Sequence, residues 1–223
     1  LGDLISVENI LKANQTCAVI IECIQGVGGL DESTTEFYQG LERLCKQYNT
    51  ILIADEVQSG FGRTGDFFAF QKHNIKPDII SIAKGMGNGF PIGGILIHPN
   101  IKPSFGLLGT TFGGNHLACA ASLSVLEVLE EEKLLENANE ISAYFIEKAK
   151  ELPGLKSIKG RGLMLGLEFD FPVSELRKQL IHKHHMFTGS AKNPNLLRIL
   201  PPLTIQKKHI DAFFVALKIE LNT

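Results

Sequence analysis

Four short runs of aliphatic residues in the first hundred positions constrain the fold of this chain most strongly. The runs are CAVIIE, ILIADE, DIISIAK and GGILIH, at residues 17–22, 51–56, 78–84 and 93–98. Each is almost continuously apolar, which is typical of strands in a mainly parallel sheet that is covered on both faces. Helical patterns at 5–13 and 33–48 alternate with the runs. The sequence therefore predicts an α/β fold with helices on both faces of the sheet.

The pattern changes after residue 116 and indicates a second domain. The elements expected there are a long helix at 117–152, two strands around a turn at 155–169, a helix near 173–184, a strand at 196–200 and a helix at 206–221. Strands grouped in this way with helices indicate an α+β layout. We therefore predict a large domain at 1–124 and a small C-terminal domain at 125–223.

Composition excludes several classes of function. The 223 residues carry a formal net charge of -2 and are 44% hydrophobic, as expected for an ordinary globular protein. There is no apolar run of membrane-spanning length and no dense basic patch for nucleic acid. The four cysteines are scattered, mostly in apolar contexts and without a CxxC pair, which favours reduced core thiols in a cytoplasmic protein. The chain opens with Leu1 in a helix-like pattern, so we expect a piece of a longer polypeptide.

Two charged residues stand at the ends of apolar runs. Asp55 follows the run at 51–54, and Lys84 follows the run at 79–83. Ligands of α/β sheets bind at the carboxyl ends of strands, and a lysine in a core is rare unless it is paired or used chemically. No GxxxxGK[ST] loop is present, which excludes a P-loop nucleotidase. An amine and a carboxylate at neighbouring strand ends suit pyridoxal phosphate, although Asp55 taken alone could also cap a turn.

Four longer stretches carry a resemblance to a known family. They are ILIADEVQSGFGRTG, PDIISIAKGMGNGFPIGG, TTFGGNHLACAAS and NLLRILPPLTI. Taken in order, they resemble the class III (subgroup II) aminotransferases of fold type I, over essentially the whole chain. The resemblance implies pyridoxal 5'-phosphate, an amino donor and 2-oxoglutarate as substrates, and a homodimer. The sequence of these stretches is most similar to the branch that uses acetylornithine or succinylornithine in arginine biosynthesis. Ornithine, 4-aminobutyrate or another ω-amino acid remains an alternative, as does a fragment that is inactive by itself.

The resemblance assigns cofactor-binding roles to four positions. Lys84 matches the lysine that bonds covalently to the cofactor's aldehyde and later moves a proton. Asp55 matches the partner of the ring nitrogen. Gln58 matches the residue that hydrogen-bonds the phenolic oxygen of the ring, and Val57 the one that packs on a ring face. Without the resemblance, Val57 would be interpreted as an ordinary core valine.

Three further positions carry roles implied by the same resemblance. Thr111 matches the hydroxyl residue that reaches the cofactor phosphate of the neighbouring subunit, so that active sites are shared between chains. Thr110 matches a position close to the substrate. Arg198 matches the arginine that binds the α-carboxylate of glutamate or 2-oxoglutarate, a task that suits its planar fork. Two adjacent threonines otherwise indicate a turn, and a lone arginine an ion-paired surface residue.

The chain departs from the family pattern in two respects. In ECIQGVGG, Val27 replaces a glutamate that can pair with the carboxylate-binding arginine, so we expect Arg198 to stay open or to find another partner. Cys23 replaces a proline in the same motif. The phosphate-binding loop, the ring-stacking aromatic and a second carboxylate-binding arginine match nothing here and are expected before residue 1. The 223 residues alone are therefore predicted to retain cofactor weakly or not at all.

Three other features suggest no additional chemistry. GRG at 160–162 is interpreted as a tight turn, because no GxGxxG follows a strand there. His182, His184 and His185 lack a nearby third acidic or thiol ligand, so no metal site is predicted. The acidic run at 130–132 is expected to be a solvated helix face.

Overall fold

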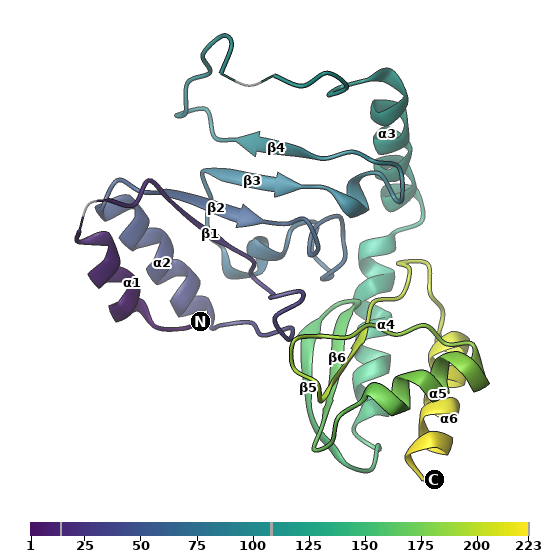
Figure 1. Ribbon diagram of the computed structural model, residues 1–223. Helices are drawn as coiled ribbons and strands as arrows, with labels where there is room; N and C mark the ends of the chain where they lie inside the picture. The colour runs from purple at the N-terminus through teal and green to yellow at the C-terminus, as the bar shows by residue number, and fades with distance from the viewer. Residues whose placement is uncertain (14, 108, 223) are drawn as a thin grey trace. The chain divides into compact units, whose positions relative to one another are not determined.

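The computed structural model describes residues 1–13, 15–107 and 109–222, and its chain divides into two compact units (Figure 1). The first unit contains Leu1–Cys23, Ser33–Phe61 and Phe68–Glu132. The second contains Ile24–Glu32, Gly62–Phe67 and Lys133–Thr223. Two short segments from the first half of the chain, 24–32 and 62–67, therefore pack with the C-terminal part.

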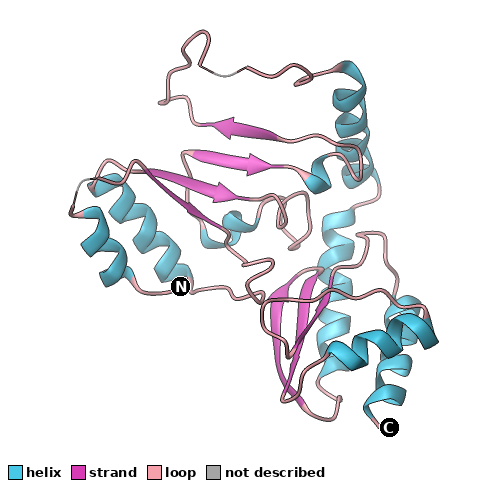
Figure 2. Cartoon of the chain, viewed as in Figure 1, coloured by secondary structure: helices cyan, strands magenta, loops and turns pink. Residues whose placement is uncertain are grey.

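A four-stranded sheet organises the first unit. Its strands are β1 (Ala18–Ile21), β2 (Ile51–Asp55), β3 (Ile79–Ile82) and β4 (Gly94–Ile97), in the order β1-β2-β3-β4. The first three strands pair in parallel, and β4 runs antiparallel to β3. Figure 2 shows these strands in magenta, lying side by side. The mainly parallel sheet expected from the apolar runs is confirmed.

One face of this sheet is covered by helices of the same unit. These are α1 (Leu4–Leu11) and α2 (Thr35–Gln47). The hydroxyl of Thr34 accepts a hydrogen bond from the Phe37 N–H and fixes the start of α2, as an N-cap does. Val19 and Ile21 of β1 pack into the resulting core, whereas Ile20, on the other side of the strand, is 62% exposed. Within the described residues, the prediction of helices on both faces is wrong at this strand.

The predicted long helix is divided in two. The structure contains α3 (His116–Glu131) and α4 (Leu134–Ala149), and Lys133 between them has a φ of 50°. A residue in the left-handed region interrupts the helix, and neither Gly nor Pro marks the break in the sequence. The two units divide between Glu132 and Lys133, at this break, whereas the predicted boundary at 124/125 falls inside α3. The acidic run at 130–132 is exposed, as expected.

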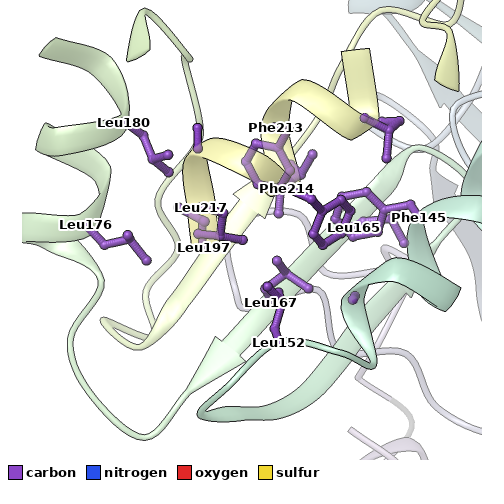
Figure 3. Packing of buried hydrophobic residues seen from close by; sticks show 14 of the residues in the cluster. Phe145, Leu152, Leu165, Leu167, Leu176, Leu180, Leu197, Phe213, Phe214 and Leu217 are labelled. Atoms are coloured by element: carbon purple, nitrogen blue, oxygen red, sulfur yellow. The ribbon is translucent and has the colours of Figure 1, made fainter. Parts of the chain in front are cut away.

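The second unit is an antiparallel sheet packed against helices, which matches the α+β layout expected for the C-terminal part. Its further elements are β5 (Leu155–Arg161), β6 (Met164–Phe169), α5 (Ser174–His184), β7 (Leu196–Ile199) and α6 (Lys207–Leu221). The sheet order is β5-β6-β7. Side chains from both strands and helices meet in its core (Figure 3), among them Phe145, Leu165, Leu167, Leu197, Phe213, Phe214 and Leu217.

The cysteines differ more in exposure than the sequence suggested. Cys23 and Cys45 are buried, but Cys17 and Cys119 are exposed, and all four are free thiols. The expectation of mostly core thiols therefore holds for half of them. Within the described ranges, no helix has both the length and the apolar character needed to cross a membrane.

Two residues of α6 give a matched test of the second core. Leu217 is 0% exposed in the core, whereas Val215 on the same helix is 61% exposed. We expect Leu217→Ala to lower the free energy of unfolding by about 2–5 kcal/mol, because the lost methyl groups leave a cavity. Val215→Ala should change it by less than about 0.5 kcal/mol. Denaturant unfolding measures both, and equal effects would contradict this assignment of the core.

Thiol reactivity offers a second test. Burial raises the pKa of the Cys45 thiol to about 11, with smaller contributions from the charges of Asp78 and Glu42. Because the thiolate is the reactive form, Cys45 should stay unmodified by iodoacetamide at pH 8 in the folded protein. The exposed Cys17 should be alkylated under the same conditions. Peptide mass mapping measures the extent at each position, and rapid modification of Cys45 would contradict the burial.

Candidate functional site

Asp55 is held at the carboxyl end of β2 by hydrogen bonds from Ser81 and Val57. In the parallel register, Asp55 lies opposite Ser81 of β3. The Ser81 hydroxyl donates to Asp55 Oδ1 at 3.1 Å, and the Val57 backbone N–H donates to the same oxygen at 3.0 Å. Oδ2 accepts no hydrogen bond from any residue in the described ranges. The carboxylate is thus oriented through one oxygen, and the other is available to a ligand.

Lys84 follows the neighbouring strand at the same edge of the sheet. Because β2 and β3 are parallel, their carboxyl ends lie on the same side, and Lys84 begins the 3-10 helix η2 (Lys84–Met86) directly after β3. Its side chain is exposed rather than buried, and its amine forms no ion pair or hydrogen bond within the described part of the chain. Lys84 has a φ of 43°, a strained value for a residue other than glycine. Such strain concentrates at functional positions.

The loop after Asp55 is anchored by a carboxylate that the sequence interpretation missed. Glu56 is buried and accepts hydrogen bonds from the Ser59 hydroxyl at 2.6 Å and from the backbone N–H groups of Ala69 and Phe70, each at 2.9 Å. Ala69 begins the short helix η1 (Ala69–His73), so Glu56 acts as its anchor. The sequence feature that could have indicated the role of Glu56 was its position as a second acidic residue directly after Asp55.

The other predicted cofactor contacts lie near Asp55 along the chain. Val57 and Gln58 are half-buried in the loop that follows β2. Ser81, which orients Asp55, was also missed by the sequence interpretation, since only the strand register places it opposite the carboxylate.

Thr110 and Thr111 occupy an exposed segment before α3. The Thr110 hydroxyl accepts a hydrogen bond from the Gly113 N–H at 3.2 Å and shapes a turn. Within the described residues, no hydrogen bond joins either threonine to Asp55 or Lys84. Their side chains face outward, and the neighbouring Leu107 and Phe112 are exposed as well.

Arg198 lies on β7 in the second unit. Its backbone exchanges hydrogen bonds with Gly189, and a Cβ on Gly189 would come within 3.1 Å of the Arg198 Cβ. Glycine at 189 therefore makes room for the arginine stem. The guanidinium Nη1 donates to the backbone carbonyl of Gly26 at 2.6 Å. Arg198 thus has a neutral backbone acceptor at the motif where the family pattern places a glutamate.

Val27 offers the guanidinium of Arg198 no carboxylate, because its side chain is uncharged. Its side chain is 59% exposed, and its carbonyl accepts from the Lys192 N–H at 2.9 Å. The expectation that Arg198 finds a partner other than a carboxylate at position 27 agrees with the Gly26 contact.

One residue of the histidine cluster, His184, is engaged in a structural contact. His184 Nε2 lies 2.8 Å from Glu220 Oε1, and Lys183 contacts the other oxygen of that carboxylate at 3.2 Å. The hydrogen bond with His184 is the largest influence that lowers the pKa of Glu220. In the described residues, no three His, Cys, Asp or Glu side chains are arranged to hold a metal ion.

Comparison with known proteins identifies the family. The Aminotransferase class-III family profile matches residues 3–221, so the chain belongs to the class-III aminotransferases. Acetylornithine aminotransferase of Aquifex aeolicus is 47% identical over 95% of this chain, and that of Methanocaldococcus jannaschii is 40% identical over 92%. These matches cover 55% and 52% of the relatives, so the chain spans about half the length of the curated proteins it matches.

Solved structures support the fold. Ornithine aminotransferase from Plasmodium yoelii superposes with a TM-score of 0.89 at 33% identity, covering 99% of this chain and 60% of that one. The ornithine aminotransferase of Toxoplasma gondii gives a TM-score of 0.88 at 28% identity, covering 99% of this chain and 54% of that one. The fold-type I architecture expected from the sequence is confirmed.

The donor set at the sheet edge fits the cofactor of this family. Class III aminotransferases depend on pyridoxal 5'-phosphate, whose aldehyde requires an amine and whose ring nitrogen requires an anion. Lys84 offers an amine without a protein partner in the described ranges, and Asp55 offers a carboxylate oxygen without one. The chemistry of these two groups matches the two ends of the pyridine ring.

Proposed function

We propose that the protein containing this chain transfers the δ-amino group of N2-acetylornithine or N2-succinylornithine to 2-oxoglutarate. The observation that carries the proposal is the pairing of β2 with β3, which puts Asp55 and Lys84 at one edge of the sheet. The curated relatives named acetylornithine aminotransferase favour this donor and a role in arginine biosynthesis. We further propose a cytoplasmic location, the compartment in which free thiols persist.

Asp55 would hold the ring nitrogen of the cofactor. Ser81 and Val57 fix Oδ1, and Oδ2 would be the oxygen that meets the ring nitrogen. An anion within about 4–6 Å raises the pKa of a ring nitrogen by roughly 1–3 units, which corresponds to about 1.4–4 kcal/mol. Pyridoxal phosphate, when bound, supplies an electron sink for the substrate carbon, and a protonated ring strengthens it.

Lys84 would bind the cofactor covalently through Nζ and, once released, move a proton at the substrate carbon. A lysine does this well when its surroundings disfavour the charged form, which requires that the exposed amine become enclosed in the complete site. Gln58 would hydrogen-bond the phenolic oxygen of the ring, and Val57 would pack on a ring face. Both lie in the loop that Glu56 anchors.

Thr111 would contact the cofactor phosphate of a partner subunit, with Thr110 near the substrate, in a homodimer. The proposal is supported by the exposed apolar residues around these threonines and on α3. They include Phe105, Leu107, Phe112, Leu117 and Leu123. Apolar groups gathered in this way indicate a surface that another chain covers.

Arg198 would bind the α-carboxylate of glutamate or 2-oxoglutarate. Its Nη1 is fixed by the Gly26 carbonyl, an acceptor without net charge. The guanidinium held in this way offers a planar fork that suits a bidentate carboxylate.

Ornithine itself is the second candidate donor, with 4-aminobutyrate and other ω-amino acids further behind. Ornithine aminotransferase 1 of Staphylococcus saprophyticus is 38% identical over 94% of this chain, and several of the solved neighbours are ornithine aminotransferases. Assays of the full-length protein with acetylornithine, succinylornithine, ornithine and 4-aminobutyrate distinguish these donors.

Trapping the cofactor tests the role of Lys84. We expect borohydride reduction of the full-length protein to leave pyridoxyl phosphate on the peptide that carries Lys84, because reduction makes the bond to Nζ permanent. Lys84→Ala should lose the label and transaminase activity, whereas Lys102→Ala, at an exposed lysine in the same unit, should retain both. Labelling of a different lysine, or activity of Lys84→Ala close to that of the unaltered protein, would refute the proposal. The 223-residue chain alone should trap little cofactor.

A carboxylate at position 27 tests the role of Arg198. We expect Val27→Glu to raise the KM for glutamate and 2-oxoglutarate relative to that for the amino donor, because the new anion competes for the guanidinium. A change of about tenfold corresponds to about 1.4 kcal/mol. Val27→Gln, which adds similar bulk without charge, is the control. Unchanged discrimination between glutamate and the amino donor would count against this role.

A further inference from the structure

The GRG turn at 160–162 packs closely against a distant part of the chain. It joins β5 to β6 as a hairpin, with Gly162 at a φ of 57°. A Cβ on Gly162 would lie 2.3 Å from the carbonyl carbon of Thr64, so the turn touches the backbone of segment 62–67. The Leu163 N–H also donates to the Arg63 carbonyl at 2.9 Å. A tight turn is present, but it lies at Gly162 and Leu163, because β5 continues to Arg161. Its glycine permits a close backbone contact.

Arg161, between the two glycines of this turn, bridges two segments of the second unit. Its Nε donates to Glu32 at 2.9 Å, and its Nη1 donates to Asp66 at 2.8 Å and to the Thr64 carbonyl at 3.1 Å. The side chain is only 17% exposed. One guanidinium therefore fixes the end of segment 24–32 and the end of segment 62–67 at once.

Segment 24–32 carries the carbonyl that holds Arg198. The segment is a closed loop, in which Ile24 forms a β-bridge with Glu32. The Gln25 N–H donates to the backbone carbonyl of Asp31 at 3.0 Å, and the Leu30 N–H donates to that of Gln25 at 2.8 Å. Gly26, inside this loop, accepts from Arg198 Nη1. A displacement of Glu32 is therefore transmitted through its bridge with Ile24 to the residues beside Gly26.

The loop has other anchors besides Arg161 and the contacts of Gly26 and Val27 described above. Lys159 of the same strand contacts Asp31 at 2.8 Å, and Leu30 is buried in a small cluster with Ile24, Met164 and Leu196. Loss of Arg161 should therefore leave the loop attached to the second unit but less precisely placed.

We propose that Arg161 is a positioning residue for carboxylate binding, which acts by fixing the loop that holds Arg198. It would set the orientation of the Arg198 guanidinium toward the α-carboxylate of the substrate without contacting the substrate itself. The inference rests on the proposed transaminase function. The guanidinium suits this task better than an ammonium group, because it donates in fixed directions to Glu32 and Asp66 simultaneously.

Steady-state kinetics of the full-length holoenzyme test the inference. We expect Arg161→Met to raise the KM for glutamate and 2-oxoglutarate roughly tenfold, a coupling within the range of residues that share a contact network. The kcat should change by less than about threefold, and Arg161→Lys should give an intermediate KM. Lys178→Met, which removes an exposed ion pair with Glu175 in the same unit, should leave both constants unchanged.

A double variant and hydrogen exchange separate positioning from general stability. The effect of Arg161→Met on KM should disappear in an Arg198→Met background, if Arg161 acts through Arg198. The amides of Gln25 and Leu30 should exchange faster in Arg161→Met than in the unaltered protein. If Arg161→Met does not fold, Glu32→Gln removes one partner of the same bridge and should raise KM in the same direction.

The outcomes distinguish the two proposals. An active protein whose KM for glutamate is unchanged by Arg161→Met or Glu32→Gln overturns the positioning role and leaves the proposed function intact. An equal effect of Arg161→Met with and without Arg198 also overturns it. A full-length protein without transaminase activity on any of the four donors overturns the proposed function and, with it, this inference.

Discussion

The parallel pairing of β2 with β3 is the constraint on which the candidate site depends. Two parallel strands must end at the same edge, so Asp55 and the η2 helix that begins at Lys84 share that edge. The pairing also supplies the Ser81 hydroxyl that orients the carboxylate. A single backbone arrangement therefore both places Asp55 and Lys84 at one edge and fixes the direction of the Asp55 carboxylate.

The polar side chains around this edge differ in whether they anchor the loop or are available to a ligand. Glu56 is buried and accepts hydrogen bonds from Ser59, Ala69 and Phe70, which makes it an anchor for the loop after Asp55. Asp55 keeps one oxygen without a partner within the described residues, and the strained backbone at Lys84 presents an amine to solvent. Adjacent acidic residues thus have opposite tasks, set by burial and by the number of donors each one meets.

In the second unit, contacts with a loop likewise orient a charged side chain, the guanidinium of Arg198. Two arginines on the same face of one antiparallel sheet contact the loop at 24–32. Arg198 contacts the Gly26 carbonyl, and Arg161 contacts the carboxylate of Glu32. A loop remote in sequence from β7 therefore determines how the guanidinium of Arg198 is held.

The sequence by itself determined the class of fold, the family and the strand ends that carry Asp55 and Lys84, because apolar runs and the residues that end them are local features. It also located Arg198 on a strand and indicated a turn near Gly162. Only the tertiary structure decided the Ser81 contact, the helix break at Lys133, the exposure of Ile20 and the Arg161 bridge. Each of these depends on strand register or on contacts between residues far apart in the chain, and local propensity carries no information about either.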